Sequence, residues 1–385
     1  MVTPSFGVSH WIRRPSTWLC LAALMLALIP VSQAGKSIYG PAAAAQATLA
    51  FFVVTPAIAA AAAWEASRFQ AFVRQAARPV RTIVFDRILV FALVAPAGYT
   101  LALLTQMVGI PTVPIGLVLA MLAYSLLVGV CWALIGGALG LVVRPIIAVT
   151  VAGLIAYAWY AITPSLRPGV LRRLTGDFVA CCSLNTTLDP QALIAASLGI
   201  VGFALAVIGA VLALRAARAK HGLHTGLASS AAGIACLIVG VVMSTRMDTF
   251  GLTARDTDAI QCDAEVCAWP EVPPQTRQLN AEAKTLFRNL APEHWKPYAD
   301  PPVQWGEFSL DHLSLSGQTS VEGVLGEFVD QAGLAALVRE NATICGAPAS
   351  EVGMVLSGQP WAPDAPIDPQ QVNQRLEQAL CKPQG

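Results

Sequence analysis

Charged side chains are scarce in this sequence. Of its 385 residues, 12% are Asp, Glu, Lys or Arg and 55% are hydrophobic, whereas a soluble domain has about 25% charged residues. Seven apolar stretches contain no Asp, Glu, Lys, Arg or His, and a helix needs roughly 20 such residues to cross a bilayer. They are residues 16–33, 44–64, 88–108, 114–142, 145–163, 192–214 and 225–244. The composition therefore predicts an all-α polytopic membrane protein with seven transmembrane helices.

The sequence also lacks the short motifs of common catalytic sites. It has no HExxH, no Gly-rich phosphate loop, no GxSxG and no CxxC pair, so we expect neither an enzyme nor a bound metal or cofactor. Because the predicted spans hold no ionisable groups, they offer no relay for protons or ions. Any transport would then take its energy from a partner protein.

Charge divides the chain into two parts. Residues 1–244 carry 15 Lys+Arg and 4 Asp+Glu, whereas residues 245–385 carry 9 and 19. We interpret residues 1–244 as a transmembrane domain and residues 245–385 as a C-terminal, disulfide-containing soluble domain of mixed α/β or mainly α structure. Helices are predicted in the second part over about 278–291, about 320–340 and from Pro369 onward, with strands near 303–315.

The basic residues predict the orientation. Eleven Lys or Arg residues near the spans fall on one side of the membrane and four on the other if the N-terminus is inside, which marks the first side as cytoplasmic. Seven crossings then place residues 245–385 in an extracytoplasmic position. The Arg-rich and Ala-rich composition is typical of a high-GC bacterium, so the expected location is the inner membrane.

Three further features of the predicted spans concern cleavage, helix packing and the membrane interface. Arg13-Arg14, the apolar run that follows and Ser32-Gln33-Ala34 are also compatible with a cleaved signal peptide, which would leave six spans in the same orientation. Gly136, Gly137 and Gly140 would let another helix pack closely against the fourth span. Aromatic residues at span ends are typical of the membrane interface, and here they are Trp18, Trp64, Trp159 and Tyr160.

Cysteine placement agrees with this orientation. Three cysteines lie within the predicted spans, and the other six lie on the outer side, where an oxidising compartment permits disulfides. These six are Cys181, Cys182, Cys262, Cys267, Cys345 and Cys381. Several connectivities are possible, and we favour Cys262–Cys267 and Cys345–Cys381. A bond between the adjacent Cys181 and Cys182 would strain a small ring, so we expect at least one of them to pair elsewhere or stay free. A buried Trp269 is expected after the Cys262–Cys267 loop.

The loop after the second predicted span begins with an acidic residue and continues as a basic amphipathic helix. Glu65 follows the span, and the apolar face of the helix comprises Phe69, Phe72, Val73 and Ala76. Such a helix lies in the membrane interface with its basic groups free for a protein or for lipid headgroups. Simple positive-inside anchoring would account for the same residues.

This arrangement resembles the permease subunits of type-2 ATP-binding-cassette exporters over about residues 10–220. Glu65 and Arg68 match the start of that family's coupling helix, and Arg78-Pro79-Val80 matches the turn before its third span. The connection from Leu166 to Gln191 lies where the family has short re-entrant helices. The chain departs from the family in its seventh span and its outer domain.

The resemblance implies the membrane subunit of an ATP-driven transport complex. A separate ATPase would dock on residues 65–87, and the permease would act as a homodimer or as a heterodimer with a second permease, in the lipid bilayer and without a nucleic-acid partner. The docking residues implied are Glu65, Arg68, Arg74, Arg78, Pro79 and Arg81. The chain has no Walker motif and would not hydrolyse ATP itself. The alternative is a non-transport membrane protein that anchors an extracytoplasmic binding or sensing domain.

Cysteine accessibility in intact cells tests this topology. A membrane-impermeant thiol reagent should leave Ala76→Cys and Ala219→Cys unlabelled and should label Ser316→Cys, because the first two positions are predicted to be cytoplasmic. Labelling of Ala76→Cys before the cells are permeabilised would invert the topology.

Overall fold

The computed structural model describes residues 14–34, 39–69, 87–108, 113–163, 170–179, 181–182, 186–219, 223–247, 251–256, 258, 261–262, 267–271, 274, 343–344 and 347–348. The chain divides into two compact units. The first, here called the membrane unit, comprises Met1–Cys182 and Thr186–Ala254, and the second comprises Ser183–Asn185 and Arg255–Gly385. The division falls slightly beyond the predicted boundary at residue 244.

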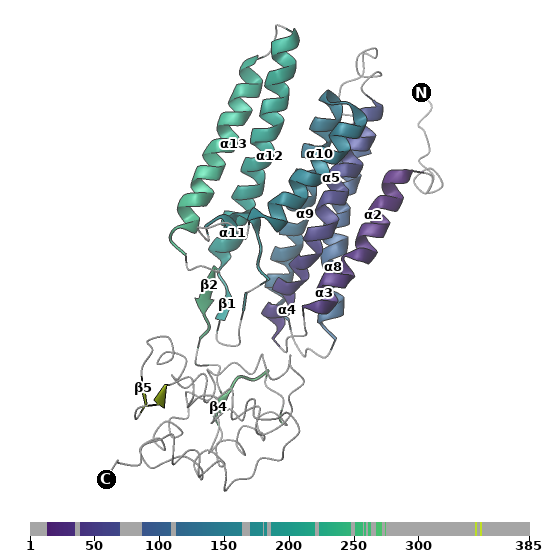
Figure 1. The fold of residues 1–385 in the computed structure, drawn as a ribbon. Helices are drawn as coiled ribbons and strands as arrows, with labels where there is room; N and C mark the ends of the chain where they lie inside the picture. Colours follow the sequence, from purple (N-terminus) through teal and green to yellow (C-terminus); the bar gives the residue numbers. More distant parts are fainter. Residues whose placement is uncertain are drawn as a thin grey trace, which may run out of the picture. The chain divides into compact units, whose positions relative to one another are not determined.

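Helices that run along a common direction make up the membrane unit (Figure 1). They are α2 (Pro15–Leu26), α3 (Leu28–Gln33), α4 (Gly40–Gln46), η1 (Ala47–Ala50), α5 (Phe51–Arg68), η3 (Leu89–Leu93), α8 (Val94–Gln106), α9 (Ile115–Val142), α10 (Pro145–Ala161), α11 (Val170–Thr175), α12 (Pro190–Ala219) and α13 (Leu223–Ser244). Six helical segments of the described chain are long and apolar enough to cross a membrane, and α10 is a shorter apolar helix.

The six membrane-length segments follow the predicted spans closely. The first joins α2 and α3 over Pro15–Gln33, and the second joins α4, η1 and α5 over Gly40–Arg68. This second segment extends one turn past the predicted end at residue 64, so that Glu65 and Arg68 belong to the helix and do not begin a loop. The prediction of apolar helices long enough to span a membrane is confirmed for these six.

The most buried of these segments contains α5. Within the most apolar 18-residue stretch of this segment, 67% is buried inside the protein, whereas 17% is buried in the corresponding stretch of α13. α5 packs against α2, α8, α9 and α10. Its contact with α9 is a close backbone approach, because a Cβ atom added at Gly136 or Gly140 would meet the backbone of Ala59 or Ala63. The predicted close packing at these glycines of α9 is confirmed.

An aromatic cluster joins the same helices. The ring of Phe51 lies 6.3 Å from that of Tyr99 in α8, 6.2 Å from that of Tyr124 in α9 and 6.1 Å from that of Tyr160 in α10. Tyr160 is therefore a core residue and not the interfacial ring that its position at a span end suggested, whereas Trp18 is 58% exposed. Ring pairs of this kind contribute about 0.5–1.5 kcal/mol each beyond their burial.

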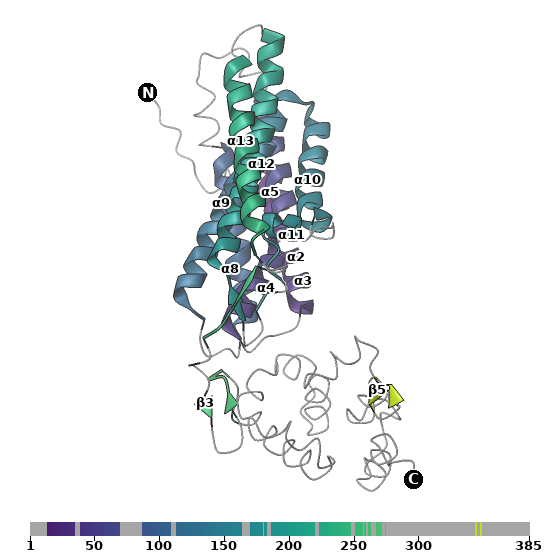
Figure 2. The same ribbon diagram turned by 90° about the vertical axis from the view of Figure 1, so that its left-hand side faces the viewer.

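α12 and α13 form a tightly packed antiparallel hairpin, visible in both views (Figures 1 and 2). Small residues permit the contact, since added Cβ atoms at Gly202 and Gly233 would each meet backbone atoms of the facing helix. The strands that flank the hairpin, β1 (Thr186–Leu188) and β2 (Leu252–Ala254), pair antiparallel with each other. Gly251 precedes β2 with a φ of 67°, a conformation that suits glycine.

The described part of the second unit contains two short hairpins. Strand β3 (Gln261–Cys262) pairs with β4 (Cys267–Ala268), and β5 (Thr343–Ile344) pairs with β6 (Ala347–Pro348). Trp269 after β4 is 1% exposed, as predicted. Arg255 donates two hydrogen bonds to Glu271 and lies 4.2 Å above the Trp269 ring. The helices predicted near 278–291, 320–340 and after 369, and the strands near 303–315, lie outside the described residues.

Gly136→Ala tests the contact between α5 and α9. The new Cβ would lie 2.9 Å from the carbonyl carbon of Ala59, so we expect a loss of about 1–3 kcal/mol in the free energy of unfolding. Gly116→Ala is the control, because its Cβ would meet no atom within 4 Å. Denaturant titration of the purified protein in mixed micelles measures both, and equal stability of the two variants would contradict the contact.

Candidate functional site at the arginine end of the membrane unit

Several arginines lie together at one end of the membrane unit. The start of α2 contacts the last turn of α5 through Ser16 and Glu65. The end of α9 contacts the end of α12 through Leu141 and Arg215. Gly140, close to Leu141, packs against Ala63 and Ala66 of α5. Arg14, Arg68, Arg144 and Arg215 therefore share one end of the bundle, which we call the arginine end.

Glu65 is buried at this end and faces into the bundle. It is 3% exposed, and its Oε1 accepts a hydrogen bond of 2.6 Å from the Ser16 hydroxyl. Its Oε2 lies 3.9 Å from Nη1 of Arg14, which is 6% exposed. An acid buried in a helical bundle requires such partners, because desolvation of an uncompensated carboxylate is costly. Glu65 thus ties α2 to α5.

Arg68, one turn later, is exposed and ends α5. Glu65 and Arg68 were predicted to act together on a partner, but the structure separates them, with one facing inward and the other outward. The other predicted docking residues, Arg74, Arg78, Pro79 and Arg81, lie outside the described residues. Among the predicted docking residues that the structure describes, Arg68 is the exposed one.

Arg215 completes the hydrogen bonding of α9. A helical carbonyl accepts from the N–H four residues later, and four residues after Leu141 stands Pro145, which has no N–H. Nη2 of Arg215 donates to the Leu141 carbonyl over 3.3 Å in its place. The spacing of Leu141 and Pro145 is visible in the sequence, but it does not indicate which residue supplies the donor.

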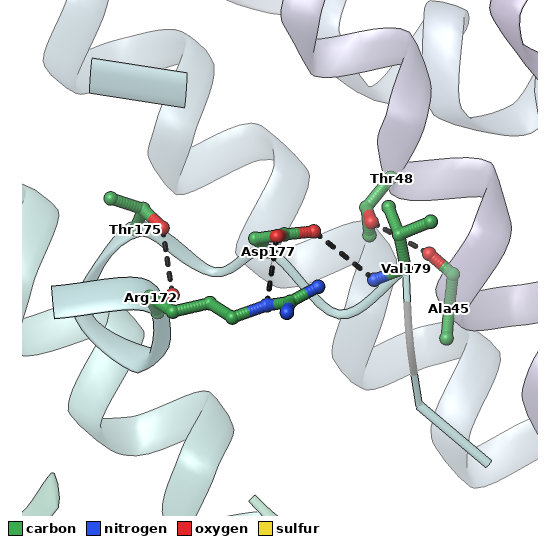
Figure 3. Close-up of polar contacts among 6 residues, drawn as sticks. All are labelled: Ala45, Thr48, Arg172, Thr175, Asp177 and Val179. Carbon is green, nitrogen blue, oxygen red and sulfur yellow. Dashed lines mark hydrogen bonds and ion pairs between the residues drawn. The ribbon is translucent and has the colours of Figure 1, made fainter. Parts of the chain in front are cut away.

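At the opposite end of the membrane unit, α11 and the turn after it form a polar cluster (Figure 3). Nε of Arg172 lies 3.0 Å from Oδ2 of Asp177, whose Oδ1 accepts from the Val179 N–H. The Tyr124 hydroxyl of α9 donates to the Thr175 carbonyl over 3.4 Å. The connection between α10 and α12 thus contains a short helix packed against α12 and α13, at the place where the sequence resemblance implied short helices.

The predicted disulfide residues have different outcomes. The structure joins Cys181 to Cys182, contrary to the expectation that at least one of them pairs elsewhere or stays free. Cys182 has a φ of 78°, an unusual backbone conformation that accompanies the closed pair. Cys262 and Cys267 are directly opposite in the β3–β4 pairing, and a disulfide between them stays a prediction. Cys345 and Cys381 lie outside the described residues.

The described residues contain no group of three or more His, Cys, Asp or Glu side chains that could hold a metal ion. No protein-family model matches the sequence, and no curated protein or solved structure is significantly similar to it.

Removal of the Glu65 carboxylate should destabilise the membrane unit. Glu65→Ala leaves Arg14 and Ser16 buried without this partner, so we expect a loss of about 3 kcal/mol in the free energy of unfolding. Arg68→Ala, an exposed neighbour on the same helix, should change it by less than about 0.5 kcal/mol. Denaturation in mixed micelles compares them, and a harmless Glu65→Ala would show that the buried contact does not stabilise the fold.

Proposed function

We propose that the chain is the membrane subunit of an ATP-driven transport complex, with a separate ATPase bound to residues 65–87, which comprise the last turn of α5 and most of the connection to η3. The observation that supports this proposal best is that this connection leaves from the end of the most buried helix segment. A partner that displaces the exposed Arg68 would move α5, and α5 packs against α2, α8, α9 and α10. Force applied at this point would therefore reach most of the bundle.

The proposal includes α10 as a seventh membrane crossing. α9 and α12 both end at the arginine end, as the bond from Arg215 to Leu141 requires. The chain must therefore return to the opposite end between residues 143 and 190, and α10 is the long helix of that interval. Its 17 residues cover about 26 Å, close to the roughly 30 Å of a hydrocarbon core.

The same proposal has the arginine end in the cytoplasm. Basic residues near membrane spans are retained on the cytoplasmic side, and an odd number of crossings then puts the second unit outside, in the expected bacterial inner membrane. Retention of the first span is part of the proposal, because cleavage after Ala34 would remove Arg14 and Ser16, the partners of buried Glu65. A homodimer or a heterodimer with a second permease would complete the complex.

The alternative is that the helices only anchor an extracytoplasmic binding or sensing domain. The division of the chain into two units is equally compatible with it. In that case the arginine end would hold the orientation of the chain and would bind no ATPase. The two proposals differ in what residues 65–87 contact.

Copurification with an ATPase decides between them. Arg68→Glu should reduce the amount of copurified ATPase at least about tenfold, because reversal of a charge at a protein contact is worth several kcal/mol. Arg144→Glu is the matched control, since Arg144 is also exposed at the arginine end but follows α9. Glu65 is unsuitable as a probe because it is buried.

The expected result is normal membrane insertion of both variants and loss of the ATPase from Arg68→Glu alone. If no ATPase copurifies with the wild type even after chemical cross-linking in cells, the transport proposal is wrong and the anchor takes its place. Equal loss in both variants would assign the binding to general basic charge and would remove the role proposed for residues 65–87.

A further inference from the structure

A cavity of about 170 Å³ lies between α9 and α12 beside the arginine end. Apolar side chains and a glycine form most of its walls, among them Ile88, Leu134, Gly137, Leu141, Ile208 and Leu212. An apolar cavity of roughly 150 Å³ is large enough to bind benzene and stays dry when empty. This cavity can therefore hold part of a hydrocarbon chain.

The cavity opens toward the outside of the membrane unit. Of the residues that line it, Leu212 is 42% exposed, whereas Ile88 is 1% exposed. Leu212 belongs to the membrane-length helix α12, where an exposed leucine faces acyl chains. The space between α9 and α12 is thus accessible from the lipid.

One cation lines this otherwise apolar space. Arg215 is its charged wall residue, and it lies seven positions, or about 10 Å along the axis, after Ile208 of α12. The cavity therefore runs from a guanidinium at the membrane end of the helix inward along apolar walls. This order of charge and hydrocarbon matches a phospholipid with an anionic headgroup, whose acyl chain extends toward the bilayer centre.

The hydrogen bond from Arg215 to Leu141 uses only part of the donor capacity of the guanidinium group. Arginine has five N–H donors in a planar fork, and the Leu141 carbonyl takes a bond from one of its nitrogens. The bond holds the fork at the mouth of the cavity, which lowers the entropy lost when a phosphate binds. Arg144, three residues after Leu141, adds a second exposed positive charge at this end.

We propose that the cavity between α9 and α12 binds one anionic phospholipid, with its phosphate on Arg215 and part of an acyl chain between the two helices. The site is independent of the proposed ATPase contact, because Arg68 does not line it. Zwitterionic lipids carry the same chains, so the preference for anionic lipid comes from Arg215.

Native mass spectrometry of the purified full chain tests the site. The protein is equilibrated with equal amounts of phosphatidylglycerol and phosphatidylcholine, and the lipids retained after detergent removal are counted. Wild type should keep one phosphatidylglycerol in preference to phosphatidylcholine. Arg215→Gln should reduce that preference at least about fivefold, the effect of about one basic residue at an anionic surface, and Arg215→Lys should keep most of it.

Two further variants separate charge from shape. Ala138→Phe would place a ring in the cavity, since Ala138 lines it, and should lower retention of the lipid although Arg215 is unchanged. Arg68→Gln, at the same end but outside the cavity, should behave as wild type. The proposal is overturned if Arg215→Gln keeps the wild-type preference, if Arg68→Gln loses it equally, or if Ala138→Phe retains the lipid in full. If inorganic phosphate stabilised the folded protein as much as phosphatidylglycerol does, the proposed contact with the acyl chain would be wrong.

Discussion

At Gly136 and Gly140 of α9, the backbone of α5 comes so close that no Cβ atom would fit between the two helices. Lipid supplies no hydrophobic force between helices, so close van der Waals packing must provide the stabilisation. The contact makes α5 the centre of the membrane unit, and α2, α8 and α10 pack around it. The aromatic cluster around Phe51 and the buried pair of Arg14 and Glu65 are both built on α5.

Different kinds of contact hold the helices together at the two ends of the bundle. At the arginine end, single contacts between distant segments hold helix ends together, such as Ser16 with Glu65 and Arg215 with Leu141. At the opposite end, α11 and the β1–β2 pair cover the helices. The arginine end thus combines fixed helix termini with exposed charge at Arg68. The proposed ATPase contact rests on that combination.

The apolar spans could be predicted to within a few residues, because length and absence of charge are local properties of a sequence. The environment of individual residues could not. Tyr160 and Trp18 both lie at span ends, yet Tyr160 is buried against Phe51 while Trp18 is exposed. Glu65 and Arg68 are three residues apart on α5 and face different surroundings. In each case the neighbouring helix decides, and its position depends on contacts distant in sequence. Composition likewise does not reveal the pairing of Cys181 with Cys182 or the positive φ of Cys182 that accompanies it.

The pairing of β1 with β2 has a consequence for synthesis and for mechanical load. β1 leads into α12 and β2 follows α13, so residues 186–254 form a helical hairpin whose open ends are joined by a ladder from Thr186 with Ala254 to Leu188 with Leu252. The Asp189 N–H adds a further bond to the Gly251 carbonyl. Such a closed loop can form only after both helices and the residues up to Ala254 have been synthesised. A pull on the chain after Ala254 is then shared between the backbone that leads to α13 and, through the ladder, β1 and α12.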